Sequence, residues 1–197
     1  MKWAEHIQDN KDNLILALTT RLGALKKISR VASFKNRKLL ANGIFLSKLS
    51  YMIALWGGCG VGLRKSLQII QNKAARFVTK LDWSSPTSTL LGQLGWLSVN
   101  RLIFYHSVLL VYKVKMSKSP MYIDNMFNWS YIYNTRQAEG GLIKIIGKPK
   151  LDVSRTNFRM RAANYYNHLP TEIRGSTTLA IFKSTVKSWI KGHVLIN

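Results

Sequence analysis

Residues 33–80 constrain the fold more than any other part of the chain, because two apolar patterns of helical period lie there on either side of a cluster of glycines. From Ser33 to Trp56, apolar residues recur too densely for a strand, and Ser33 is placed to cap the first turn. This pattern predicts a central helix that is buried on most sides. Glycines follow it at positions 57, 58, 60 and 62. Since glycine adopts positive φ at little cost, we expect the helix to end there in a hinge.

The second pattern, in residues 63–81, places apolar residues at three- and four-residue steps on one face of a helix. From Arg64 to Lys80 the chain has five basic residues and no Asp or Glu. Ordinary solvated charge is one explanation, because a surface helix needs a charged side in any case. Without acidic neighbours, however, such a face repels itself until an anion binds, so we interpret it as a candidate binding surface. Its candidate residues are Lys65, Asn72, Lys73, Arg76 and Lys80.

The excess of positive charge extends over the whole chain. Thirty Lys and Arg residues against eight Asp and Glu residues give a formal net charge of +22. Hydrophobic residues make up 47% of the sequence, which is ample for a folded core. A basic field over a folded protein favours a polyanionic partner, nucleic acid first and an acidic membrane surface second.

Three further features bear on location. Cys59 is the only cysteine, which excludes an intramolecular disulfide and a cysteine-built zinc site and favours a reducing compartment, cytoplasmic or nuclear. The first residues are polar and include Glu5 and Asp9, so no signal peptide is predicted. The longest apolar runs are short or are interrupted by Lys48 or His106, so we predict a soluble protein without a transmembrane segment.

The rest of the chain also has mainly helical patterns. Helix starts are expected at capping residues and helix ends at Gly or Pro, namely at Asp12 or Asn13, Ser84 to Pro86, Ser98, Ser154, Thr177 or Thr178 for starts and at Gly95 and Pro170 for ends. The one credible strand is Leu142 to Ile146, which allows at most a short β-hairpin. Lys, Ser and Pro cluster in residues 115–120, and this predicts a domain boundary. We therefore expect a mainly α protein with a helical bundle in residues 1–116 and a smaller basic helical region in residues 117–197.

The second region contributes its own candidate cations. Aromatic residues around Arg136 could stack on bases, although aromatics more commonly fix an irregular loop to a core. Arg155, Arg159 and Arg161 crowd the start of one predicted helix, where they add to the basic surface.

The residues predict no catalytic, metal or cofactor site. Nucleotidyl transfer by two metal ions needs carboxylates close together, whereas the eight acidic residues are scattered along the chain. The four histidines do not have the spacing of a metal site. The glycines at 57–62 do not follow a strand, so they do not predict a phosphate-binding loop or a small-molecule substrate.

A series of short sequence pieces, spread over nearly the whole chain, resembles a known family. The most specific piece is Leu67-Gln68 with Gln71-Asn72-Lys73-Ala74-Ala75-Arg76. Others, in order, are Trp3-Ala4-Glu5-His6-Ile7, Asn42 to Tyr51, Trp56-Gly57-Gly58, Gly95-Trp96-Leu97-Ser98-Val99 and Asn167-His168-Leu169-Pro170. In this order and spacing they resemble the region after the palm in reverse transcriptases of non-long-terminal-repeat retrotransposons, the LINE-like and jockey-like elements.

The resemblance implies a helical thumb that grips the template-primer duplex, followed by a helical region that helps to hold template RNA. The fingers and palm, with the paired aspartates and their magnesium ions, would lie upstream of Met1. The expected partners are therefore RNA or an RNA-DNA duplex and a separate palm and fingers segment. Phosphate contacts would come from Lys65, Lys73, Arg76 and Lys80, helped by Arg155, Arg159 and Arg161.

Two alternatives remain open at this point. The chain could be one piece of a working RNA-directed DNA polymerase that contributes to synthesis only when palm and fingers are supplied. It could also be a basic helical scaffold that binds acidic membrane or protein surfaces, because amphipathic basic helices also suit membranes.

Overall fold

The computed structural model describes residues 3–28, 31–116, 119–127, 129, 141–145 and 157–193, with the backbone alone for residues 3–12. Helices dominate these ranges and no strand occurs in them, which confirms the expected mainly α fold. The chain divides into two compact units. The first consists of Met1–Met52 and Cys59–Asn100, and the second of Ile53–Gly58 and Arg101–Asn197. This division differs from the expected boundary at residues 116 and 117, which stays a prediction.

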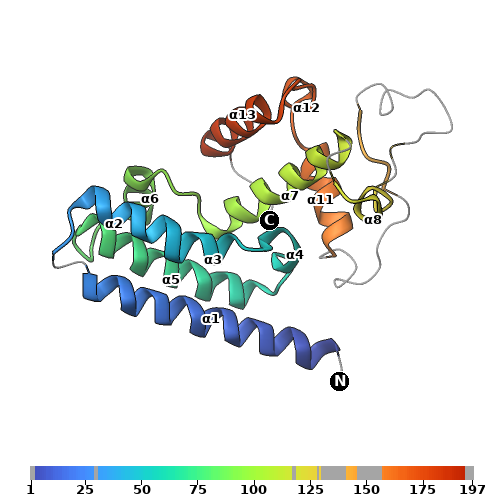
Figure 1. Cartoon of the computed structure of the whole chain (residues 1–197). Coiled ribbons are helices and arrows are strands. Elements are labelled where there is room, and N and C mark those ends of the chain that lie inside the picture. The colour runs from blue at the N-terminus through green and yellow to red at the C-terminus, as the bar shows by residue number, and fades with distance from the viewer. Residues whose placement is uncertain are drawn as a thin grey trace. The chain divides into compact units, whose positions relative to one another are not determined.

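The first unit is built from helices, of which α1 and α5 are the longest. Its elements are α1 (Trp3–Ile28), α2 (Phe34–Leu40), the π-helical turn η1 (Ala41–Leu46), α3 (Ser47–Ser50), α5 (Val61–Thr79) and α6 (Thr87–Leu94). Figure 1 shows α1, the continuous segment α2-η1-α3 and α5 lying side by side, and α6 packs against α5. The core contains Leu18 and Leu22 of α1, Phe45 of η1 and Leu67 and Ala74 of α5.

The segment that begins at Ser33 follows the sequence prediction at its start and departs from it at its end. Ser33 caps α2, and its hydroxyl accepts the Asn36 N–H at 3.4 Å. The expected single helix to Trp56 is wrong, because α3 ends at Ser50 and Met52 has a left-handed backbone with φ of 51°. The helix resumes only in α4 (Ile53–Trp56). Neither Tyr51 nor Met52 is a residue that normally signals a helix end, so packing rather than local preference sets this break.

The glycine cluster lies where a helix ends, as expected, because α4 ends at Trp56 and α5 begins at Val61, but its first glycine is needed for a reason other than positive φ. Gly57 is buried, and a Cβ added there would lie 2.5 Å from Ile103 Cγ2 and 2.6 Å from the Ile53 carbonyl oxygen. Glycine is therefore required at 57 for a close approach of backbone to side chain. Among the described glycines, positive φ occurs instead at Gly95 and Gly141. Gly95, with φ of 64°, ends α6 as predicted.

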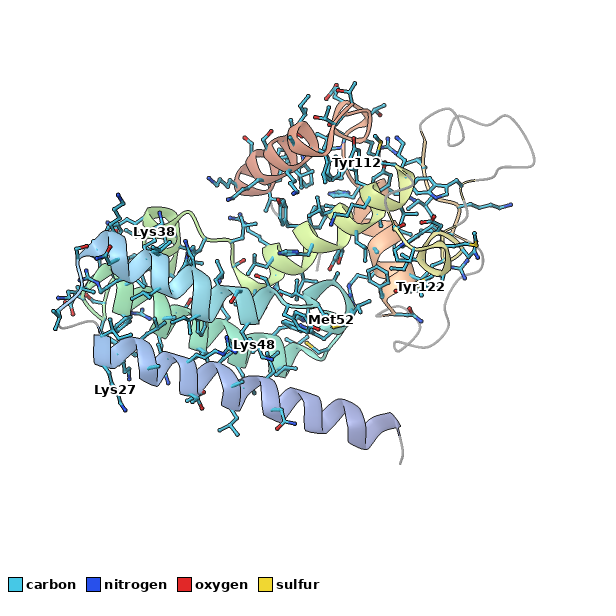
Figure 2. All side chains as sticks on the ribbon, viewed as in Figure 1. Lys27, Lys38, Lys48, Met52, Tyr112 and Tyr122 are labelled. Atoms are coloured by element: carbon cyan, nitrogen blue, oxygen red, sulfur yellow. The ribbon has the colours of Figure 1, made fainter. Side chains whose placement is uncertain are left out.

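The second unit packs its helices around aromatic side chains. Its elements are α4, most of α7 (Val99–Lys115), α8 (Met121–Asp124), α11 (Phe158–Asn167), α12 (Thr171–Arg174) and α13 (Leu179–Gly192). Tyr112 of α7 stacks on Phe182 of α13 with ring centroids 3.9 Å apart, and Figure 2 shows Tyr112 between these helices. Phe104, which lies eight residues before Tyr112 on α7, contacts Tyr165 and Trp189. Rings from three helices thus form the centre of this unit.

The strand expected at Leu142 to Ile146 is absent from its described part, residues 142–145. The Ile143 N–H donates to Asn167 Oδ1 and Asn167 Nδ2 donates to the Ile143 carbonyl oxygen, both at 2.9 Å. The side-chain amide of Asn167 therefore satisfies the two backbone groups that a neighbouring strand would otherwise pair. The side chain of Ile143 is buried, which explains the apolar pattern without a sheet.

No single helix in the described ranges is long and apolar enough to cross a bilayer. In these ranges, only α6 and α7 taken together, as a pair bent by 43°, have sufficient length and apolar composition.

Candidate nucleic-acid interface

Helix α5 carries most of the predicted binding residues, and it is the helix against which α1, α2 and α6 of the first unit pack. Its inward face is buried, with Leu67, Ile70, Ala74 and Val78 at three- and four-residue steps. On the opposite side, the side chains of Lys65, Lys73 and Lys80 are exposed. Arg76 lies between the last two, three residues after Lys73 and four before Lys80, which places the three on one face. We call Lys65, Lys73, Arg76 and Lys80 the basic stripe.

The lysines of the basic stripe are available to a ligand. Within the described part of the chain, no hydrogen-bond or ion-pair partner engages the ammonium groups of Lys65, Lys73 and Lys80. Asp82 is the one acidic side chain that the structure describes in the first unit. A cationic face without internal neutralisation favours an anion that carries several charges at regular spacing.

Asn72 has a structural role in the first unit. Its Oδ1 accepts from Gln68 Nε2 at 2.8 Å, and its Nδ2 donates to Thr87 Oγ1 of α6 at 3.3 Å. Gln71, which is fully buried, accepts from the same Gln68 nitrogen at 2.9 Å and donates to the Leu97 carbonyl oxygen at 2.9 Å. These amides fasten α5 to α6 and to the segment before α7. These hydrogen bonds engage the side-chain amide of Asn72, which the sequence predicted to contact nucleic acid.

Gln68 completes this network on its other side. Its Oε1 accepts the N–H of Val99 at 2.8 Å, which satisfies one of the free donors of the first turn of α7. The amides of Gln68, Gln71 and Asn72 recur within one helical turn, and this recurrence on a basic helix was the signal that sequence reasoning missed.

Arg76 is held by the loop that follows α5. Its Nη2 donates to the carbonyl oxygens of Trp83, at 3.2 Å, and Ser85, at 3.4 Å. Its guanidinium carbon lies 4.6 Å from the centroid of the Trp83 ring, within the range of a cation-π contact. Trp83 is itself 70% exposed. Sequence reasoning did not select Trp83, although a tryptophan in an Asp-Trp-Ser-Ser-Pro turn next to a basic helix was a usable signal.

Lys80 ends α5 in an unusual backbone conformation. Its φ of 55° and ψ of 21° are left-handed, and its N–H donates to the Arg76 carbonyl oxygen at 2.8 Å. Glycine is the residue that most often occupies this position at a helix end. At a lysine this left-handed backbone costs free energy, and the side chain adds a cation to the basic stripe.

The candidate residues of the second region do not form one group. Arg159 is exposed in the first turn of α11. Arg161 is only 8% exposed, and its Nη2 donates to the carbonyl oxygen of Ala54 in α4. A guanidinium that is buried in this way does not fit the phosphate contact predicted for Arg161. Arg136 and Arg155 lie outside the described residues.

Several cations are paired with backbone carbonyls in place of carboxylates. Arg37 is 7% exposed and donates from Nε to the Val78 oxygen at 2.9 Å and from Nη1 to the Ala32 oxygen at 2.7 Å. Lys115 donates to the Arg174 carbonyl oxygen at 3.0 Å. Burial and then the charge of Arg174 lower the pKa of Lys115. With so few acidic residues described, carbonyl oxygens are the acceptors that the fold has to offer, and we do not count Arg37 and Lys115, which are used in this way, among the binding residues.

Burial shifts the pKa of two titratable groups of the second unit, Tyr166 and His106. Burial raises the pKa of Tyr166 to about 12, so its hydroxyl stays protonated. Burial also lowers the pKa of His106, and the charge of Lys113 adds to this. Among the described residues, no three His, Cys, Asp or Glu side chains come together in a way that could hold a metal ion.

In the first unit, the predicted binding residues that remain candidates are thus those of the basic stripe, and Trp83 lies at the C-terminal end of this stripe.

Comparison of the chain with models of protein families, with curated proteins and with solved structures gave no match.

Proposed function

We propose that the chain binds RNA or an RNA-DNA duplex through phosphate contacts from the basic stripe of α5, as the thumb and post-thumb part of a non-long-terminal-repeat reverse transcriptase. The observation that carries the proposal is the exposure of Lys65, Lys73 and Lys80 on one face of a helix whose opposite face is buried. The polymerase chemistry, with its aspartates and magnesium ions, would belong to a palm, and no residue of this chain is assigned a catalytic role.

Phosphate contacts make a specific prediction about salt. Each lysine that contacts a phosphate releases a counterion, so the logarithm of affinity falls with the logarithm of salt concentration by about 0.9 per contact on a duplex. This term is independent of base sequence. The proposal therefore concerns affinity and placement on the backbone and names no sequence preference.

The test compares two pairs of exposed lysines. We expect Lys65→Gln with Lys73→Gln to lower the salt slope for an RNA-DNA hybrid by about 1.8, the sum of two contacts. The control is Lys187→Gln with Lys191→Gln, two exposed residues of α13 whose loss changes the net charge by the same amount. Binding is measured by fluorescence anisotropy from about 50 to 200 mM salt.

Two results would count against the proposal. If both pairs lower the slope equally, binding follows the overall charge and the stripe has no special part in it. If the wild-type chain binds heparin as tightly as the hybrid and single-stranded RNA, the charge of +22 accounts for all of the binding.

A further inference from the structure

The loop after α5 presents one large aromatic ring to solvent beside the basic stripe. Trp83 is 70% exposed, and its indole ring is fixed from one side by the guanidinium of Arg76 at 4.6 Å. Within the described residues, Arg76 makes the one charged or aromatic contact to this ring. Because Arg76 covers one face and most of the side chain is exposed, the other face of the ring is open to a ligand.

The loop holds this ring in a defined position. The Trp83 N–H donates to Asp82 Oδ1 at 2.6 Å, and the Ser84 hydroxyl donates to Asp82 Oδ2 at 3.3 Å. The Ser85 N–H donates to the Asp82 carbonyl oxygen at 3.1 Å. Arg76 ties the same loop back to α5 through the carbonyl oxygens of Trp83 and Ser85. A ring that is already ordered in the free protein loses little further freedom when a planar ligand stacks on it.

The surroundings of the ring are cationic on the helix side. Lys80 and Lys73 lie one turn to either side of Arg76 along α5. The Asp82 carboxylate opposes them, because it lies next to Trp83 and carries negative charge. A ligand that stacks on the ring would therefore place its negative charge toward the lysines and away from Asp82.

We propose that Trp83 is a stacking platform for an unpaired base of the bound nucleic acid, with the phosphates of that strand on the lysines of the basic stripe. The inference rests on the proposed function and adds to it a substrate class, a single-stranded segment. An aromatic face exposed beside a cationic track is the arrangement that binds single strands without sequence preference. In a continuous duplex the bases stack on one another, so the platform has no partner there.

The test uses two RNA oligonucleotides of equal length, one with all its bases and one abasic, which keeps every phosphate. For the wild-type chain we expect the loss of bases to weaken binding by about 5- to 150-fold, the range for one stacked base. For Trp83→Ala we expect the two oligonucleotides to bind within about twofold of each other, because stacking is then absent from both. Trp83→Tyr keeps an aromatic face and should restore the preference for bases.

The salt slope separates this inference from the proposed function. Trp83→Ala removes no charge, so its salt slope and its affinity for a blunt RNA-DNA hybrid should equal those of the wild type. If Trp83→Ala keeps the full preference for bases while Lys65→Gln with Lys73→Gln still lowers the slope, the stacking platform is refuted and the phosphate contacts stand. If Trp83→Ala keeps the preference for bases and Lys65→Gln with Lys73→Gln leaves the salt slope unchanged, both proposals fail. Because Trp83 is exposed, circular dichroism is expected to show the same helical content for Trp83→Ala and Trp83→Tyr as for the wild type.

Discussion

Lys80 has a left-handed backbone that costs free energy and a charge that we propose contacts phosphate, so its replacement by glycine should change stability and binding in opposite directions. The left-handed backbone at this residue costs a side-chain-bearing residue about 1–2 kcal/mol, and glycine avoids this cost. Glycine also has more conformational freedom to lose on folding, by about 0.5–1 kcal/mol. The difference predicts that Lys80→Gly stabilises the fold by about 0.5–1 kcal/mol, and raises the melting temperature by about 1–4 °C for a chain of this length.

The same substitution should weaken binding. Loss of one phosphate contact lowers the salt slope on a duplex by about 0.9. Most substitutions that weaken binding have no effect on stability or reduce it, so a variant that is more stable and binds less tightly is a distinctive outcome.

The matched control is Lys80→Ala, which removes the same charge and keeps a Cβ in the left-handed conformation. We expect Lys80→Ala to lower the salt slope as Lys80→Gly does, without raising the melting temperature. Thermal unfolding by circular dichroism and anisotropy titrations over a salt series measure the two effects. A melting temperature for Lys80→Gly at or below that of Lys80→Ala would refute the backbone argument, and an unchanged slope in both would remove Lys80 from the interface.

Three further predictions concern residues outside the stripe. Arg37→Ala should reduce the free energy of unfolding by about 2–3 kcal/mol in urea titrations, because it leaves the buried Val78 carbonyl oxygen without its donor; a change below about 0.5 kcal/mol would contradict this. For His106 the charged form is disfavoured in the folded state, because its pKa is lowered there. Its contribution to the free energy of unfolding should therefore be constant above the ordinary pKa of 6.5 and fall as the pH falls below it. His106→Gln should flatten this dependence between about pH 7.5 and 5.5. Asp82→Asn keeps an acceptor for the Trp83 N–H and removes the opposing charge, so affinity for single-stranded RNA should rise in anisotropy titrations; a decrease would show that the carboxylate favours binding.

Local sequence preferences predicted the helical class and several helix ends. Ser33 caps α2 because its hydroxyl reaches a backbone N–H three residues away, and Gly95 ends α6 because it takes positive φ. The amphipathic pattern of α5 predicted which side of that helix is buried. Each of these features depends on residues within one or two turns, so the sequence contains the information directly.

The break at Met52 and the missing strand at 142–145 show where local patterns are insufficient. Met52 carries no local signal for a left-handed backbone, and the division of the chain into two compact units falls directly after it. Ile143 belongs to an apolar run, but its backbone groups are satisfied by the side chain of Asn167, 24 positions away. A pattern read along the chain does not contain such a partner.

The sequence by itself determined a mainly α protein with a large positive charge and an amphipathic basic helix, because composition and helical period are local properties. Only the tertiary structure decided which cations reach solvent. Lys73 and Lys80 are exposed, whereas the guanidinium of Arg161 is bound to the Ala54 carbonyl oxygen, 107 positions away, and the amide of Asn72 is bound to Thr87. With few carboxylates available, a buried cation takes a carbonyl oxygen from whichever helix packs against it, and that choice depends on the packing of segments far apart in the chain.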